Sequence, residues 1–325
     1  MPADADDADD PDTDEHMSAG RWGRWYFAVQ ALAGAAWWVS VFLVPPVRAA
    51  TLGSLDPVVM AVLDVPLFVV ASALAACAIR WAAILATGWT LLVTVSLGIF
   101  AAVTQEAGIG ALLMVGAAVG SVTALALVLT GGIPRAWIAI GPFAFRPADA
   151  SASTVSQLVR TAVEIVAFWG VFLAVIPAVL RFFELRWRVT VALPPGAEQF
   201  AVVIGIVVVV LGSVVGLWSA AAMATTGGGT PLPAAMPNRL VIAGPYRVVR
   251  NPMAVGSIVQ GVGVGLLLSS WIVVVYAVFG AVVWNVLVRP VEEADLEARF
   301  GEPYRRYRED LRCWVPSLRP VAARS

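Results

Sequence analysis

The chain has 325 residues, of which 60% are hydrophobic and only 13% are charged, whereas roughly 25% of the residues of an average soluble domain are charged. This composition excludes an ordinary soluble protein and makes the lipid bilayer its expected main partner. The net charge is −1, and no nucleic acid is expected among its partners.

Few side chains are available for metal or imidazole chemistry. The single histidine, His16, lies in an acidic N-terminal run, and the two cysteines, Cys77 and Cys313, lie far apart at no metal or redox spacing. A zinc site or a nucleophile paired with histidine needs several such residues together. We therefore expect no metal, two free thiols and no histidine-based catalysis.

The first residues form an acidic run that differs from the rest of the chain. Residues 1–16 contain eight acids, three alanines, two prolines and no arginine. Such a segment cannot bury enough apolar surface to offset its ordering entropy, so residues 1–20 are predicted to be a disordered tail. A secretory signal would instead need a basic start before its apolar core.

Eight apolar stretches follow, and each approaches the roughly 20 residues that a membrane-spanning helix needs. They are residues 24–44, 58–79, 82–103, 109–130, 161–180, 199–223, 253–270 and 272–288. The sequence thus predicts an all-α polytopic membrane protein with about eight transmembrane helices, a C-terminal helical hairpin and a cytoplasmic amphipathic C-terminal helix. We expect residues 21–150 to form a four-helix block, and residues 151–325 to form a second membrane domain.

The arginines indicate an orientation, because cytoplasmic loops carry the excess of positive charge. With the N-terminus inside, 17 of the 21 basic residues fall on the inner side. The remaining four, Arg48 and the cluster Arg181, Arg186 and Arg188, would lie outside, and this cluster argues against the topology. We predict a multi-pass protein, expected in the plasma membrane, with both termini in the cytoplasm.

Asp64 is the only acid inside the first four spans. An ionisable residue at membrane depth is a functional hypothesis by default. Pro66 follows two residues later, however, and suggests a broken helix in which the carboxyl group satisfies backbone groups freed by the proline. We favour this structural interpretation over the functional one.

The chemistry-bearing residues flank the predicted hairpin. Arg250 and Pro252 begin its first helix, and Glu292 and Glu293 follow its second. A hairpin returns the chain to its starting end, so these groups should converge. Proline suits the first helical turn, a helix N-terminus attracts anions, and arginine presents a planar fork to a carboxylate. Alternatively, Arg250 and the glutamates pair only with one another at the membrane interface.

This region resembles the integral membrane methyltransferases typified by isoprenylcysteine carboxyl methyltransferase and the phospholipid N-methyltransferases, over about residues 200–320. The matching positions are Arg250, Asn251, Pro252, Ala254, Gly256, Glu292, Glu293, Phe300, Gly301, Tyr304 and Tyr307. The family has a histidine at the position of Asn251 and a tyrosine at that of Ala254. Roles that need those two side chains therefore do not carry over.

The resemblance implies S-adenosyl-L-methionine as the cofactor, bound at the cytosolic side, and makes residues 151–325 a methyltransferase-like membrane domain. The lipophilic acceptor would enter from the bilayer and be prenylcysteine carboxylate-like or phospholipid/isoprenoid-like. The expected cofactor-binding residues are Tyr246, Arg250, Asn251, Pro252, Gly256, Glu292, Glu293 and Tyr304. No catalytic residue is assigned.

Two other functions stay open. Membrane sterol reductases that use NADPH share a similar C-terminal layout, although this chain matches less of their pattern. A non-enzymatic membrane protein that retains the family core is the third possibility, and Asn251 and Ala254 are its best support.

Overall fold

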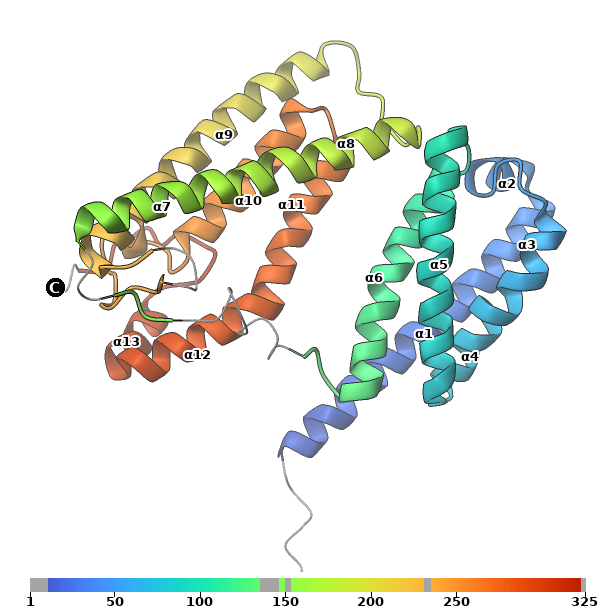
Figure 1. The fold of residues 1–325 in the computed structure, drawn as a ribbon, viewed down its shortest axis with the longest axis horizontal. Coiled ribbons are helices and arrows are strands. Elements are labelled where there is room, and N and C mark those ends of the chain that lie inside the picture. The colour runs from blue at the N-terminus through green and yellow to red at the C-terminus, as the bar shows by residue number, and fades with distance from the viewer. Residues whose placement is uncertain (1–10, 135–145, 150–152, 231–234, 323–325) are drawn as a thin grey trace, which may run out of the picture. The chain divides into compact units, whose positions relative to one another are not determined.

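The computed structural model describes residues 11–134, 146–149, 153–230 and 235–322 (Figure 1). These described residues are mostly helical and form no β-strand beyond one isolated bridge between Pro147 and Met236. The chain divides into two compact units. Unit 1 comprises Met1–Pro134 with Leu185–Val189, and unit 2 comprises Arg135–Glu184 with Thr190–Ser325.

Seven helical segments of the described chain are long and apolar enough to cross a membrane. They are Ser18–Leu43, Pro57–Ala76, Arg80–Thr104, Gly108–Thr130, Val155–Arg186, Ala197–Gly227 and Trp271–Phe300. The eighth predicted span is the 16-residue helix Pro252–Leu267. Such a helix is about 24 Å long, shorter than the roughly 30 Å of a bilayer's hydrocarbon core. The predicted all-α polytopic membrane fold is confirmed, with one span shorter than expected.

Unit 1 is built from helices packed side by side. Its elements are α1 (Pro11–Leu43), α2 (Pro45–Thr51), α3 (Pro57–Asp64), the π-helical turn η1 (Val65–Val70), α4 (Ala71–Ala76), α5 (Arg80–Thr104) and α6 (Gly108–Thr130). Helix α1 packs on α4 and α6, and α5 packs on α6. A Cβ atom on Gly23 of α1 would lie 2.7 Å from the Ala124 carbonyl oxygen of α6, so glycine permits this close approach.

The start of α1 differs from the sequence prediction. The helix begins at Pro11, so residues 11–20 are helical, where the sequence predicted a disordered tail. A proline in the first helical turn loses no hydrogen bond, and acidic residues there are favoured by the helix dipole. Residues 1–10 of the predicted tail lie outside the described residues.

A buried polar network joins three helices inside unit 1. Gln30 of α1 donates through Nε2 to Ser72 Oγ of α4 at 3.0 Å, and Ser121 Oγ of α6 donates to Gln30 Oε1 at 2.8 Å. All three side chains are at least 94% buried. The amide of Gln30 therefore satisfies two hydroxyl groups that would otherwise lie unpaired in an apolar core.

Asp64 has a different partner from the one predicted. Its carboxylate accepts hydrogen bonds from the indole of Trp38 at 2.8 Å and from the indole of Trp89 at 2.7 Å. The next turn, η1, contains Pro66 and is π-helical, which is one way in which a helix accommodates a proline. The carboxylate thus ties α1 and α5 to the end of α3 through side chains, and not through freed backbone groups.

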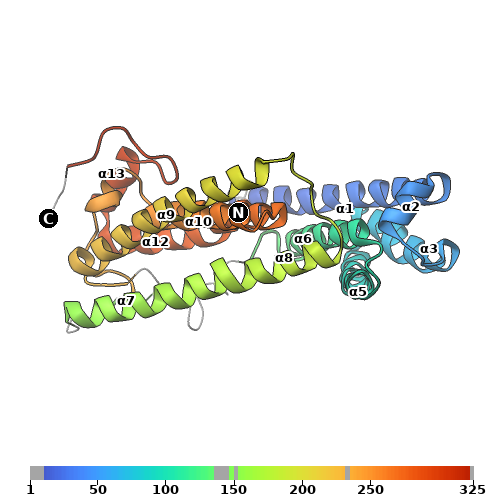
Figure 2. The ribbon, with the colours of Figure 1, turned by 90° about the horizontal axis from the view of Figure 1, so that it is seen from above.

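Unit 2 contains the predicted hairpin, α10 (Pro252–Leu267) and α11 (Trp271–Val283). Its other elements are α7 (Thr154–Trp169), η4 (Gly170–Val175), α8 (Ile176–Arg186, whose last two residues fall in unit 1), α9 (Ala197–Ala222), η5 (Met223–Gly227), η7 (Gly244–Arg247), η8 (Trp284–Val288), α12 (Arg289–Phe300) and α13 (Glu302–Asp310). Helices α9 and α10 lie along each other in both views (Figures 1 and 2). Where they cross, a Cβ atom on Gly212 would lie 2.9 Å from the Gly256 carbonyl oxygen.

Two arginines that argued against the predicted topology make contacts within the protein. Arg181 Nη1 lies 3.3 Å from Glu184 Oε1 in unit 2, and the Ser270 hydroxyl at the start of α11 donates to the same carboxylate. In unit 1, Arg186 donates to the carbonyl oxygens of Ala102 and Val103 near the end of α5. These contacts give both arginines a packing role, and the membrane orientation itself stays a prediction.

Candidate functional site

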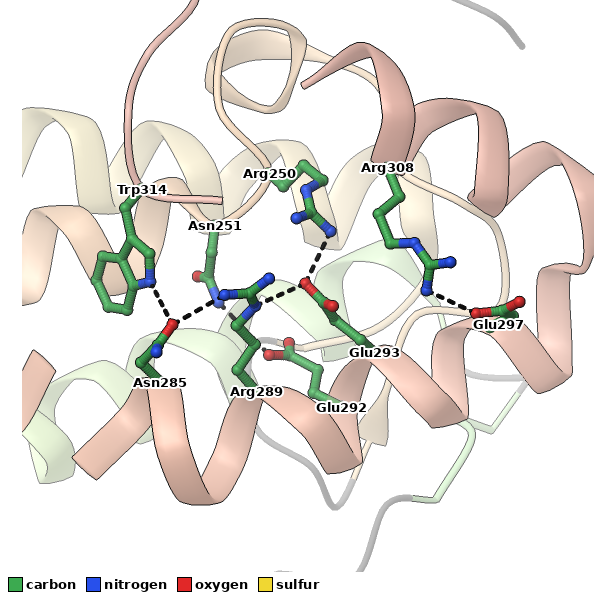
Figure 3. Close-up of polar contacts among 9 residues, drawn as sticks. All are labelled: Arg250, Asn251, Asn285, Arg289, Glu292, Glu293, Glu297, Arg308 and Trp314. Atoms are coloured by element: carbon green, nitrogen blue, oxygen red, sulfur yellow. Dashed lines mark hydrogen bonds and ion pairs between the residues drawn. The ribbon is translucent and has the colours of Figure 1, made fainter. Parts of the chain in front are cut away.

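The α10–α11 hairpin brings Arg250 and Asn251, just before α10, to Glu292 and Glu293 on α12 (Figure 3). Arg250 Nη1 lies 2.7 Å from Glu293 Oε1, and Asn251 Nδ2 lies 3.4 Å from Glu292 Oε2. More than forty residues separate the partners along the chain. The hairpin is the physical reason for this convergence, because α11 returns the chain to the end at which α10 begins.

Arg250 is the most enclosed cation of the group, with a side chain that is 10% exposed. Its Nη1 is paired with Glu293, but its Nε is buried and has no hydrogen-bond acceptor among the described residues. A buried donor left unpaired costs about 1–3 kcal/mol. The guanidinium therefore has a donor to offer to an anionic or carbonyl oxygen of a ligand.

Asn251 caps helix α10. Its Oδ1 accepts a hydrogen bond from the Ala254 backbone N–H at 3.1 Å, and Pro252 occupies the first helical turn. Asparagine is among the best N-cap residues, which gives a structural reason for this residue type. The cap occupies the Ala254 N–H and the proline has none, so this helix end offers an anion fewer donors than the sequence suggested.

Glu293 accepts from a second arginine that the sequence analysis missed. Arg289 donates through Nε to Glu293 Oε1 at 2.9 Å and through Nη1 to Asn285 Oδ1 at 2.9 Å. The Trp314 indole also donates to Asn285 Oδ1, at 3.1 Å. These contacts form a continuous polar chain from Arg250 to Trp314 (Figure 3). The four-residue spacing of Asn285, Arg289 and Glu293 was a usable signal, because such residues are neighbours on one helix face.

Glu292 is less tightly held than Glu293. Asn251 occupies its Oε2, while its Oε1 makes no hydrogen bond in the described part of the chain. Tyr246 lies near this carboxylate: burial, followed by the negative charge of Glu292, raises the pKa of the Tyr246 phenol well above its usual range. Glu292 thus has a free acceptor oxygen beside a phenol that stays protonated at neutral pH.

Residues 200–303 match the family model of phospholipid methyltransferases. This match confirms the resemblance to membrane methyltransferases for that segment, which we call the methyltransferase segment. It runs from α9 into the start of α13 and contains every predicted site residue except Tyr304, one position beyond its end. Neither the curated proteins nor the solved structures compared with the chain gave a match.

Gly256 of the methyltransferase segment does not join the polar group. It is buried in the α9–α10 contact, where a Cβ atom would lie 3.1 Å from the Gly212 carbonyl oxygen. Pro252 is likewise fully buried at the start of α10. Helix packing and helix initiation explain these two residue types, and a direct cofactor contact is not needed for either.

Tyr304 and Tyr307 of α13 pack beside the methyltransferase segment, in a cluster with Ile242 and Leu311. The Tyr307 hydroxyl donates to the Tyr246 carbonyl oxygen at 2.7 Å. Burial and the charge of Glu293 raise the pKa of the Tyr304 phenol to about 12, although Arg250 beside it acts in the opposite direction. Tyr304 is therefore a neutral phenol at physiological pH, unable to act as a base.

The last described residues pack back along the loop before α10. In this C-terminal strap, residues 311–321, the carbonyl oxygens of Arg312 and Cys313 accept from the backbone N–H groups of Arg250 and Asn251, at 3.1 and 3.3 Å. Farther along, the Ser317 N–H donates to the Val248 carbonyl oxygen at 2.7 Å. The strap thereby fixes the backbone that presents Arg250. No sequence pattern predicted it.

The two cysteines and the metal-ligating side chain types can be located among the described residues. Both cysteines are free, as expected, and burial raises the pKa of the Cys313 thiol. No group of three or more histidine, cysteine, aspartate or glutamate side chains that could hold a metal occurs among the described residues. The site therefore offers hydrogen bonds and charge for binding, without an evident nucleophile.

Proposed function

We propose that this protein transfers a methyl group from S-adenosyl-L-methionine to a lipophilic acceptor that reaches the site from the bilayer. The observation that carries the proposal is the buried Arg250, with its unpaired Nε, beside Glu292 and within the methyltransferase segment. We place the site at the cytoplasmic face of the plasma membrane, with both termini inside, on the strength of the arginine distribution.

The available groups fit the cofactor's polar end. Its carboxylate would bind Arg250, whose Nε is a free donor, and its amine or ribose hydroxyls would bind Glu292, whose Oε1 is a free acceptor. Tyr246 and Tyr304 would line the site as neutral phenols. Asn251, Pro252 and Gly256 would act indirectly, by starting α10 and seating it on α9. Glu293 would hold Arg250 in place.

These assignments separate what the cofactor would supply from what the protein would supply. When bound, S-adenosyl-L-methionine supplies an activated methyl group on a sulfonium. The residues of the chain contribute alignment and exclusion of water, which can supply a large part of a barrier reduction. Because both tyrosines stay protonated and the site has no histidine, the carboxylate of Glu292 would have to take the proton of an amine acceptor, whereas an acceptor that is already nucleophilic at neutral pH, such as a carboxylate, needs no base.

The acceptor would arrive through the lipid. Helix α11 exposes large apolar side chains, among them Val275, Val278, Phe279 and Val282, and exposed apolar surface on a membrane helix is matched to acyl chains. These side chains belong to the helix that leads directly to Glu292. A lipid-borne acceptor can therefore diffuse along α11 towards the polar group at its end.

The test is transfer of radiolabelled methyl from S-adenosyl-L-methionine, by the purified full-length protein, into a lipid extract of the native membrane. We expect label in the organic phase. Mild alkali would release it as methanol from a carboxyl ester, but not from a methylated phospholipid amine. Label confined to the aqueous phase, together with no cofactor binding in calorimetry, would refute the proposal. Oxidation of NADPH in a parallel assay would favour the reductase.

A further inference from the structure

Unit 1 carries a depression that the methyltransferase match does not include and the proposed reaction does not use. It is lined by Arg21, Arg24, Trp25 and Ala28 of α1 and by Ala76 at the end of α4. We propose that this depression is a binding site for an anionic phospholipid, with Arg21 and Arg24 holding the headgroup phosphate. The site is independent of the proposed methyl transfer.

The packing of α1 fixes which residues face the depression. Gly23 approaches the α6 backbone, and Phe27 and Gln30 are buried in the unit. Arg21, Arg24 and Ala28 follow another face, at a spacing of three and four residues that places side chains on neighbouring turns. Two alanines, Ala28 and Ala76, provide the small side chains that leave space between α1 and α4.

The two guanidinium groups have no acidic partner among the side chains that the structure describes. Neither Arg21 nor Arg24 makes a side-chain hydrogen bond or ion pair in the described structure, although most arginines of unit 2 do. Three and four positions before Arg21 the chain has Ser18 and Met17. Three and four positions before Arg24 it has Arg21 and Gly20. No carboxylate is therefore available one turn away, and the two positive charges stand together without an acidic partner among the described side chains. A phosphate would neutralise both, through the forked geometry that arginine offers.

The surroundings favour a lipid over a free phosphate ion. Trp25, in the depression, is 67% exposed, and Trp22 on the same turn is 69% exposed. Exposed tryptophans are typical of the membrane–water interface. Farther along α1, Val29 and Leu32 are exposed and apolar, so acyl chains would have a surface next to the headgroup site. Basic pockets between transmembrane helices are known sites for anionic headgroups.

The test is native mass spectrometry of the full-length protein in detergent, with phosphatidylglycerol, phosphatidylcholine or inorganic phosphate added. We expect retained phosphatidylglycerol, and about tenfold or greater weakening of its binding in Arg21→Gln/Arg24→Gln. The matched control, Arg48→Gln/Arg188→Gln, removes two arginine charges elsewhere in unit 1 and should bind as the native protein does. Binding of S-adenosyl-L-methionine should be unchanged in both variants.

A second variant tests the depression itself. Ala28→Phe keeps both arginines but fills the space between α1 and α4, and it should weaken phosphatidylglycerol binding to a similar extent. Equal retention of phosphatidylcholine, equal loss in the control variant, or full displacement of the lipid by millimolar inorganic phosphate would each overturn the proposal. A thermal unfolding curve identical to that of the native protein shows that Ala28→Phe is folded, and undiminished lipid binding by it would also overturn the proposal.

Discussion

The two units treat their buried polar groups differently. In the described part of unit 1, every buried side-chain nitrogen and oxygen has a hydrogen-bond partner. The unpartnered buried atoms that the structure describes all belong to unit 2: Thr161 Oγ1, Glu164 Oε2, Arg181 Nη1, Glu184 Oε1, Thr230 Oγ1, Arg250 Nε and Trp284 Nε1. Arg181 and Glu184 offset each other as an ion pair. Arg250 is the one of these that lies at the convergence of charged groups.

This contrast separates two uses of polarity within a membrane protein. Gln30 and Asp64 in unit 1 sit where each acceptor meets a donor from another helix, so their polarity holds helices together. Arg250 in unit 2 is held by Glu293 through Nη1 and lies beside Tyr304, while its buried Nε has no acceptor among the described residues. Unsatisfied buried groups are rare and call for an explanation, and a ligand is the one that we propose.

The largest expected effect tests the unpaired Nε of Arg250 as a cofactor contact. Arg250→Ala should weaken binding of S-adenosyl-L-methionine by about 100-fold, because removing one partner of a buried charged contact costs roughly 2–5 kcal/mol. Calorimetry on the purified protein measures it. Arg250→Lys keeps the charge but loses the planar, bidentate geometry of the guanidinium, and should bind the cofactor with intermediate affinity.

The matched control lies in unit 1. Gln30→Ala removes an equally buried polar side chain whose partners are all within the protein. It should lower the melting temperature and leave cofactor affinity unchanged. If Arg250→Ala binds the cofactor as tightly as the native protein does, Arg250 and Glu293 are only an interfacial ion pair, as the simpler interpretation holds.

The second prediction concerns the carboxylate at membrane depth. Asp64→Ala leaves the indole N–H groups of Trp38 and Trp89 without their acceptor. At about 1–3 kcal/mol for each of the two orphaned groups, unfolding should become easier by roughly 2–6 kcal/mol. Thermal unfolding in detergent measures this change.

Asp64→Ala also separates structural from functional polarity. The protein that remains folded below the lowered melting temperature should bind S-adenosyl-L-methionine and transfer methyl groups as the native one does. Asp56→Ala, which removes an exposed cap of α3, is the control and should cost about 1 kcal/mol. Unchanged stability with lost activity in Asp64→Ala would show that the carboxylate is functional.

The hairpin made part of the site predictable from the sequence. Two apolar stretches joined by a short turn must return the chain to its starting end, so Arg250 and the glutamates could be placed together before their contacts were known. Asn251 was harder to interpret. Compared with the family's histidine, this asparagine suggested the loss of a functional side chain. An asparagine directly before a proline at a helix start is, however, also the pattern of an N-cap.

Other parts of the site left no local signal. The strap residue Trp314 reaches Asn285 across 29 positions, and its backbone pairs with a loop instead of with a regular element. Such contacts depend on how α12 and α13 fold the chain back, which periodicity does not encode. The indole partners of Asp64 were missed for the same reason, because Trp38 and Trp89 come from helices far apart in the sequence.

The smallest predicted effect tests whether the C-terminal strap holds the backbone of Arg250 and Asn251 in place. Trp314→Phe keeps the aromatic ring but removes the N–H donor to Asn285, a partly exposed contact worth about 1 kcal/mol. We expect faster hydrogen exchange at the backbone N–H groups of Arg250 and Asn251, which the strap covers, and cofactor binding weakened by about two- to fivefold. Trp22→Phe, an equally conservative change at an exposed residue of unit 1, should alter neither measurement. If cofactor binding falls while hydrogen exchange at the Arg250 N–H is unchanged, Trp314 touches the cofactor itself. A strap that acts only through the backbone would have to loosen that backbone first.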